Sequence, residues 1–245
     1  MVMAVILAGG TGTRIGASVP KQFIEIGGKP ILVWTLEIFQ RNREIDAIEI
    51  VCHKDWMDHT RSLVERYGLS KVRFITEGGS SYQESFMKGI FNLKEVLKAG
   101  DIVVSSFGVS PMTTDDIIAD NLRVCRAHGN AIASADETLC TCIKDDEESS
   151  VTPILRETLK GFANPWSFEF SELVEAYETG LKTGILDTLE PHTTSLYFAL
   201  GKRIWFSKTN TLNIKITTPE DLDIFEGQLL LREKRQREGR KEVLK

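Results

Sequence analysis

The sequence predicts an α/β fold in which a doubly wound, mostly parallel sheet is covered by helices. Three observations lead to this prediction: an unbroken apolar run at the start, further short apolar segments, and helical patterns between them. The run Val2–Ala8 has strand length and no polar alternation, which is typical of a parallel strand buried on both faces. Regular alternation of strands with helices favours a parallel sheet.

Local patterns place the elements of the first half. Pro30 opens a helical segment whose apolar side chains recur on one face, and proline is well tolerated at the first helical position. A second amphipathic segment begins at Ser81 and is the longest of this half. We therefore predict helices over residues 30–39, 58–67 and 81–97, and strands over residues 47–52, 72–75 and 102–105.

The second half is less regular. Strand patterns over residues 131–135 and 139–143 precede an acidic loop, and strand character returns over residues 152–159. We expect residues 137–162, approximately, to project as an arm that packs on another subunit. With no linker, repeat or low-complexity stretch, we predict one domain over residues 1–245. Its last elements are a helix over residues 168–179, strands over residues 203–206 and 213–216, and a final helix opened by Pro219.

The composition excludes several classes of partner. The net charge of −5 gives no general attraction to polyanions, so we expect no nucleic-acid partner. The apolar start is too short to span a membrane and follows no basic segment, so we expect neither a membrane partner nor export. Four scattered cysteines, including the pair Cys140 and Cys142, fit reduced thiols in a cytoplasmic protein.

A glycine-rich segment, L-A-G-G-T-G-T-R, ends at Arg14 and directly follows the first strand. Glycine lets backbone N–H groups approach phosphate oxygens without a Cβ in the way. Arg14 adds a fixed forked charge, and Lys21 adds a mobile ammonium after the stiff Pro20. The pattern favours phosphate binding over a purely structural turn or a dinucleotide site, and no Gly-Lys-Ser/Thr closes a Walker A motif.

The longer segment L-A-G-G-T-G-T-R-I-G-x-x-x-P-K-Q-F resembles the opening of the cytidylyltransferases that act on 2-C-methyl-D-erythritol 4-phosphate and on ribitol 5-phosphate. The resemblance continues at residues 28–31, at residues 77–79 with Ser85, and at residues 213–222. Residues 54–59 resemble the ribitol type more closely. The resemblance implies a nucleotidyltransferase-type (Rossmann-like) sheet, CTP and a polyol phosphate as substrates, Mg²⁺ as cofactor, and a homodimer.

The same resemblance implies a role for individual residues. Arg14, Lys21 and Lys215 would be catalytic, because they would neutralise charge as the α-phosphate is attacked. Thr141 and Arg156 would hold the polyol phosphate across a dimer interface. The nucleotide would be bound by Leu7, Ala8, Gly9, Gly10, Thr11, Gly12 and Thr13 in the loop, and by Gly79 and Ser85 against the cytosine.

Several positions depart from the family pattern. Phe107 and Ser110 stand where the family has a metal-site aspartate and an arginine, and Tyr82 stands where an arginine is expected. Trp166 replaces a glutamine, and His192 stands near the usual aspartate. Cys140 replaces an aspartate before Thr141. Asp115, Asp116 and Asp136 are the acids near these positions in sequence, and they are best interpreted as loop and helix-start charges.

These departures leave the metal ligands unknown and three functions open. The chain could be an active cytidylyltransferase, which the intact loop and the lysines favour. It could be a catalytically impaired paralogue that binds nucleotide or an active homologue, because phosphoryl-type transfer depends on a metal that bridges phosphate oxygens. It could also be a nucleotidyltransferase for another base or sugar phosphate.

Overall fold

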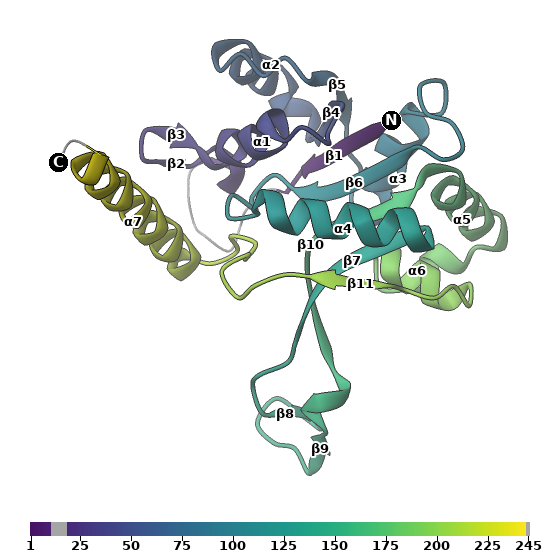
Figure 1. The fold of residues 1–245 in the computed structure, drawn as a ribbon. Coiled ribbons are helices and arrows are strands. Elements are labelled where there is room, and N and C mark those ends of the chain that lie inside the picture. The colour runs from purple at the N-terminus through teal and green to yellow at the C-terminus, as the bar shows by residue number, and fades with distance from the viewer. Residues whose placement is uncertain (11–18, 244–245) are drawn as a thin grey trace.

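The computed structural model describes residues 1–10 and 19–243, and Thr11, Gly12, Thr13 and Arg14 lie outside the described residues. A seven-stranded sheet forms the centre of the molecule (Figure 1). Its order is β11 (Phe206–Lys208), β7 (Asn130–Asp136), β10 (Lys160–Glu169), β6 (Ile102–Phe107), β1 (Val2–Ala8), β4 (Ala47–Cys52) and β5 (Val72–Glu77).

The predicted parallel sheet is confirmed, with one antiparallel strand inside it. Strand β1 pairs in parallel with β4 and β6, and β4 pairs in parallel with β5. Strand β10, which the sequence did not predict, runs antiparallel between β6 and β7. Its pairing with β7 shifts register between Phe162 and Trp166, close to Pro165, which cannot donate a ladder hydrogen bond.

Helices cover both faces of the sheet and create two cores. On one face α1 (Ile31–Arg41), α2 (Met57–Arg66) and α4 (Asp115–His128) pack against residues such as Ala4 and Ile6. On the other, α3 (Tyr82–Asn92), α5 (Phe170–Thr183) and α6 (Thr193–Ala199) pack against Met3 and Val5. All seven residues of β1 are buried, as expected for a strand whose alternate side chains enter different cores.

Some element boundaries differ from the prediction. Helix α3 ends at Asn92, and the chain continues in tight turns in which Val96 and Leu97 donate to the carbonyl of Leu93. Strand β11 starts at Phe206, because the side chain of Asn130 accepts from the Trp205 N–H and donates to the Arg203 carbonyl in the preceding residues.

The predicted arm is present and projects from the sheet beyond β7 and β10 (Figure 1). It carries the antiparallel pair β8 (Thr141–Ile143) and β9 (Thr152–Ile154). The predicted strand over residues 152–159 is wrong after Ile154, because Arg156–Thr158 forms a 3-10 turn. Further 3-10 turns are Lys21–Phe23, Lys54–Trp56 and Ile185–Thr188.

The segment over residues 213–216 contacts the loop after β6, and the chain then continues into the final helix. The predicted strand over residues 213–216 is wrong; the segment is irregular, and it is fixed by the Ile216 N–H, which donates to the Val109 carbonyl. Helix α7 (Pro219–Val243) then packs Phe225 against Trp34 beside the hairpin of β2 (Glu25–Ile26) and β3 (Lys29–Pro30). Among the helices of residues 1–10 and 19–243, none is both long and apolar enough to cross a membrane.

Candidate functional site

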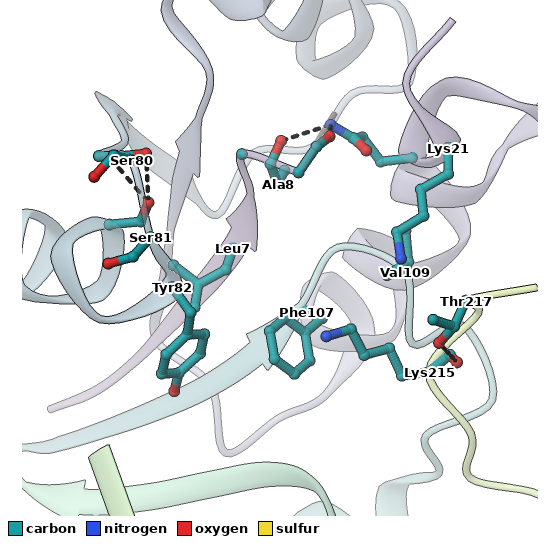
Figure 2. A pocket seen from close by; sticks show the side chains of 15 residues that line it. Leu7, Ala8, Lys21, Ser80, Ser81, Tyr82, Phe107, Val109, Lys215 and Thr217 are labelled. Atoms are coloured by element: carbon teal, nitrogen blue, oxygen red, sulfur yellow. Dashed lines mark hydrogen bonds between the residues drawn. The ribbon is translucent and has the colours of Figure 1, made fainter. Parts of the chain in front are cut away.

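A cavity of about 320 Å³ opens where strands β1 and β6 end, beside the first turn of α3 (Figure 2). In open α/β sheets, ligands bind in crevices beyond the carboxyl ends of the strands. The cavity is lined by Leu7, Ala8, Gly9, Gly10, Lys21, Gln22, Gly79, Ser80, Ser81, Tyr82, Ser85, Phe107, Val109, Lys215 and Thr217.

Gln22 fixes the backbone at the end of β1. Its side chain is buried, and its Nε2 donates to the carbonyls of Ala8 at 2.7 Å and Gly10 at 3.0 Å. A Cβ built on Gly10 would meet nothing within 4 Å, so the backbone at Gly10 faces open space. Gln22 was not predicted to have a role, although it stands within the P-K-Q-F part of the motif.

The two residues predicted to face the base, Gly79 and Ser85, both line the cavity. The Gly79 N–H donates to the Ser85 Oγ at 2.9 Å, so the buried hydroxyl holds the loop. A Cβ on Gly79 would lie 2.3 Å from the carboxyl carbon of Glu84, which explains the glycine.

The first turn of α3 is capped from both directions. Ser81 Oγ accepts from the Glu84 N–H, and the Glu84 carboxylate accepts from the N–H and hydroxyl of Ser80. The bonds from Ser80, helped by Lys88, lower the pKa of Glu84 to about 2. This arrangement is a variant of the capping box, and it fixes the rim of the cavity at Ser80 and Ser81.

Two lysines reach the cavity from segments almost two hundred residues apart in sequence (Figure 2). The Lys21 Nζ donates to the Ile216 carbonyl at 2.9 Å, which ties the start of the chain to its C-terminal segment. The Lys215 Nζ lies 3.4 Å from the centroid of the Phe107 ring, a cation–π contact. Two ammonium groups at one cavity favour an anionic ligand.

Four of the positions that depart from the family pattern lie in one aromatic cluster, formed by Tyr82, Phe107, Trp166 and His192. The Tyr82 ring centroid is 5.5 Å from that of Phe107, 6.0 Å from Trp166 and 5.2 Å from His192. Burial raises the pKa of Tyr82 to about 12, so its hydroxyl is neutral at physiological pH. The sequence flagged each position, and their mutual contact is the new finding.

The described residues do not fit a magnesium ion held by the protein. Mg²⁺ in phosphate sites is usually bound through one or two carboxylates, and neither Asp nor Glu occurs among the described residues that line the cavity. Asp115 accepts from Asn42, Asp136 pairs with Lys160, and Asp116 is exposed. Within residues 1–10 and 19–243, no three His, Cys, Asp or Glu side chains are grouped closely enough to hold a metal.

The two predicted substrate residues lie on the arm and do not reach the cavity of their own chain. The exposed Arg156 donates to the Thr138 carbonyl at 3.1 Å and lies 3.6 Å from the Glu157 carboxylate. Thr141 donates to the Leu139 carbonyl at 3.1 Å. Their predicted role therefore requires a second copy of the chain.

The sheet, the glycine-rich strand end and the paired lysines define an α/β protein of the nucleotidyltransferase type. A model of the family "IspD: 2-C-methyl-D-erythritol 4-phosphate cytidylyltransferase" matches residues 2–231, and the chain belongs to this family.

Relatives with two different acceptors are similar over almost the whole chain. The ribitol-5-phosphate cytidylyltransferase of Lacticaseibacillus paracasei is 32% identical over 229 residues, which cover 94% of this chain and 98% of that protein. The 2-C-methyl-D-erythritol 4-phosphate cytidylyltransferase of Geobacter metallireducens is 33% identical over 227 residues, 92% of this chain and 96% of that one.

The solved structure of the 2-C-methyl-D-erythritol 4-phosphate cytidylyltransferase of Francisella tularensis has the same fold. It matches with a TM-score of 0.78 at 22% identity and covers 93% of this chain and 99% of its own.

Proposed function

We propose that this chain transfers a cytidylyl group from CTP to ribitol 5-phosphate. A phosphate oxygen of the acceptor attacks the α-phosphorus of CTP and forms the new P–O bond. The bond from that phosphorus to the bridging oxygen breaks, and pyrophosphate leaves with the electron pair. The observation that carries the proposal is the convergence of Lys21 and Lys215 on the cavity at the end of β1.

The reaction needs positioning and charge neutralisation and no covalent nucleophile from the protein. Gln22 holds the carbonyls of Ala8 and Gly10, so the glycine backbone is shaped before nucleotide arrives. Lys21 is oriented by the Ile216 carbonyl and would meet the developing negative charge on the phosphates. Gly79 and Ser85, which line the same cavity, would hold the base.

The acceptor is tested by a pyrophosphate-release assay of the full chain with CTP. We expect turnover with ribitol 5-phosphate and less with 2-C-methyl-D-erythritol 4-phosphate, because residues 54–59 resemble the ribitol type. A preference for the second acceptor would reassign the substrate. No turnover with either acceptor at high enzyme concentration would overturn the proposed reaction.

We also propose that the chain works as a cytoplasmic homodimer joined through the arm. The arm exposes large apolar side chains, among them Val151 at 89%, Leu139 at 71% and Leu155 at 67%, the last of which directly precedes Arg156. An arm seated on a second copy would cover these side chains and would bring Arg156 near the partner's acceptor site. Sedimentation of wild type and Val151→Asp tests this assembly; a monomeric wild type would contradict it.

The aromatic cluster favours one second candidate, a nucleotide-binding paralogue without turnover. Tyr82 and Phe107 occupy positions where the family pattern has an arginine and an aspartate, at the edge of the cavity. This candidate predicts CTP binding by calorimetry without pyrophosphate release. A thermal-shift screen with the four nucleoside triphosphates tests base selectivity in the same experiment series, because a specific ligand raises apparent stability.

A further inference from the structure

We propose that this pocket neutralises the triphosphate with Lys21 and Lys215, without a divalent cation held by a protein carboxylate, and that the Phe107 ring orients Lys215. Phe107 is then a positioning residue for Lys215. The inference rests on the proposed binding of CTP and concerns how this chain differs from the pattern of its family.

Among the described residues, two carboxylates are hydrogen-bonded to residues that line the cavity, and both have protein partners. Glu84 accepts hydrogen bonds from Ser80 and pairs with Lys88 at 3.2 Å. Asp221 accepts from the N–H groups of Thr217 at 2.6 Å and Thr218 at 2.9 Å, where it caps α7. The segment T-G-T-R-I-G-A-S over residues 11–18 contains no acid in its sequence. A magnesium ion that arrives with CTP is therefore left to phosphate oxygens and water.

Backbone hydrogen bonds hold the ring and the ammonium in place. The Gly108 N–H donates to the Leu7 carbonyl at 2.8 Å, which fixes the end of β6 against β1. The Ile216 N–H donates to the Val109 carbonyl at 2.9 Å, which fixes the residue after Lys215 to the loop after β6. The 3.4 Å contact between Lys215 Nζ and the Phe107 ring is thus held by three segments: the end of β1, the end of β6 with the loop after it, and the segment around Lys215.

The aromatic cluster supports Phe107 from its other side. Tyr82 contacts Phe107 and also packs against Phe86 of α3 with a centroid distance of 6.0 Å. The ring face turned toward Lys215 attracts the ammonium, whereas an aspartate at this position would bind a hard cation or pair with the lysine. Phe107 therefore orients the Lys215 ammonium at the cavity.

Calorimetry of the full chain with CTP, in excess EDTA and in magnesium buffer, tests the inference. We expect the wild-type Kd to differ by less than about threefold between the two buffers. A Kd more than about tenfold weaker in EDTA would overturn the inference and leave the proposed function intact. Failure of CTP to bind in both buffers would overturn both.

Substitutions at Phe107 test the positioning role. Phe107→Leu keeps an apolar side chain and removes the ring, and we expect it to weaken CTP binding about two- to fivefold. Phe107→Tyr keeps the ring and should recover most of that loss. Equal binding by the Leu and Tyr variants would overturn the role of the ring.

The reverse change adds the missing carboxylate. Phe107→Asp should make CTP binding depend on magnesium by at least about tenfold, because the new carboxylate can ligate the ion beside the phosphates. A folded Phe107→Asp variant whose binding ignores magnesium would count against the inference. If this variant does not fold, the wild-type titrations in EDTA and in magnesium buffer still decide the dependence on magnesium.

Discussion

The two sides of the cavity have kept the family pattern to different degrees. On the side formed by β1 and the residues around Lys21, the motif residues that the structure describes lie together at the cavity. On the side formed by the end of β6 and the start of α3, polar positions of the pattern hold aromatic rings that contact one another. A single charged residue buried among aromatic rings would be costly. We therefore expect that these positions changed from polar to aromatic residues together.

The proposed nucleotide side and the proposed acceptor side therefore differ in the contacts that hold them. Gln22 binds the backbone at the end of β1, whereas the aromatic cluster is held by contacts between rings. Two contacts join the sides: the Gly108 N–H donates to the Leu7 carbonyl, and Lys215 touches Phe107 while it lines the cavity.

The largest expected effect on stability comes from restoring the family's arginine at Tyr82 while the other three aromatic side chains are kept. Tyr82→Arg places a guanidinium among Phe107, Trp166 and His192 and should destabilise the fold by about 3 to 5 kcal/mol, since no carboxylate compensates the charge. Chemical denaturation measures this loss. The double variant with Phe107→Asp should recover about 1 to 2 kcal/mol, and strict additivity of the two single effects would show that the rings did not change as a set.

Glu49 tests the packing of helix α3 on the central sheet beneath the cavity. This buried side chain of β4 lies under α3, and its Oε1 accepts from Thr76 at 2.6 Å and Asn92 at 2.9 Å. Burial raises the pKa of Glu49 from 4.5 to about 7, so the native state binds the proton more tightly than the unfolded state. Its contribution to stability is complete below pH 4.5 and is lost as the pH rises through about 7.

Glu49→Gln should therefore flatten the decline of stability with pH. Above pH 7 the variant should exceed wild type by up to about 3 kcal/mol in free energy of unfolding, measured by denaturation across pH. The exposed Glu95→Gln serves as the matched control. A variant that is less stable than wild type above pH 7 would contradict a raised pKa for Glu49.

On the nucleotide side, Lys21→Ala should weaken CTP binding roughly 10- to 30-fold, because a charge-assisted contact to phosphate is removed. Calorimetry measures the Kd, and Lys182→Ala, an exposed lysine of α5, is the control for loss of net charge. Unchanged affinity in Lys21→Ala would place the triphosphate elsewhere.

The smallest effect concerns the helix cap that the two sides share. Ser81→Ala removes the acceptor of the Glu84 N–H and should cost about 1 kcal/mol of stability. The melting temperature should fall by a few degrees, whereas Ser62→Ala within α2 should leave it nearly unchanged. An equal fall in melting temperature for both variants would show that the Ser81 cap does not stabilise α3.

The parts of the fold that follow from local pattern were predicted correctly. Strand β1 is a continuous apolar run, β4, β5 and β6 coincide with short segments rich in apolar residues, and the glycine-rich segment directly follows the first strand. Strand β10 was missed because Gly161 and the Asn164-Pro165 pair interrupt its pattern, and its place between β6 and β7 depends on long-range pairing. Strand β11 was displaced because a single side chain, Asn130, satisfies the backbone before it.

The candidate site divides in the same way. Lys21 and the glycines are close in sequence, so a shared phosphate-binding role could be predicted from their spacing. The aromatic cluster joins four distant segments, and each ring by itself resembles an ordinary core residue. The missing carboxylate could be inferred from Phe107, whereas the contact with Lys215 required the structure.

Strand β10 begins at the root of the arm and carries Trp166 into the acceptor side a few residues later. The backbone of β10 thus joins the root of the arm to the wall that holds Trp166, through the register shift between Phe162 and Trp166. In the proposed dimer, a displacement of the arm root would move this backbone, so subunit pairing and the position of Trp166 would be coupled.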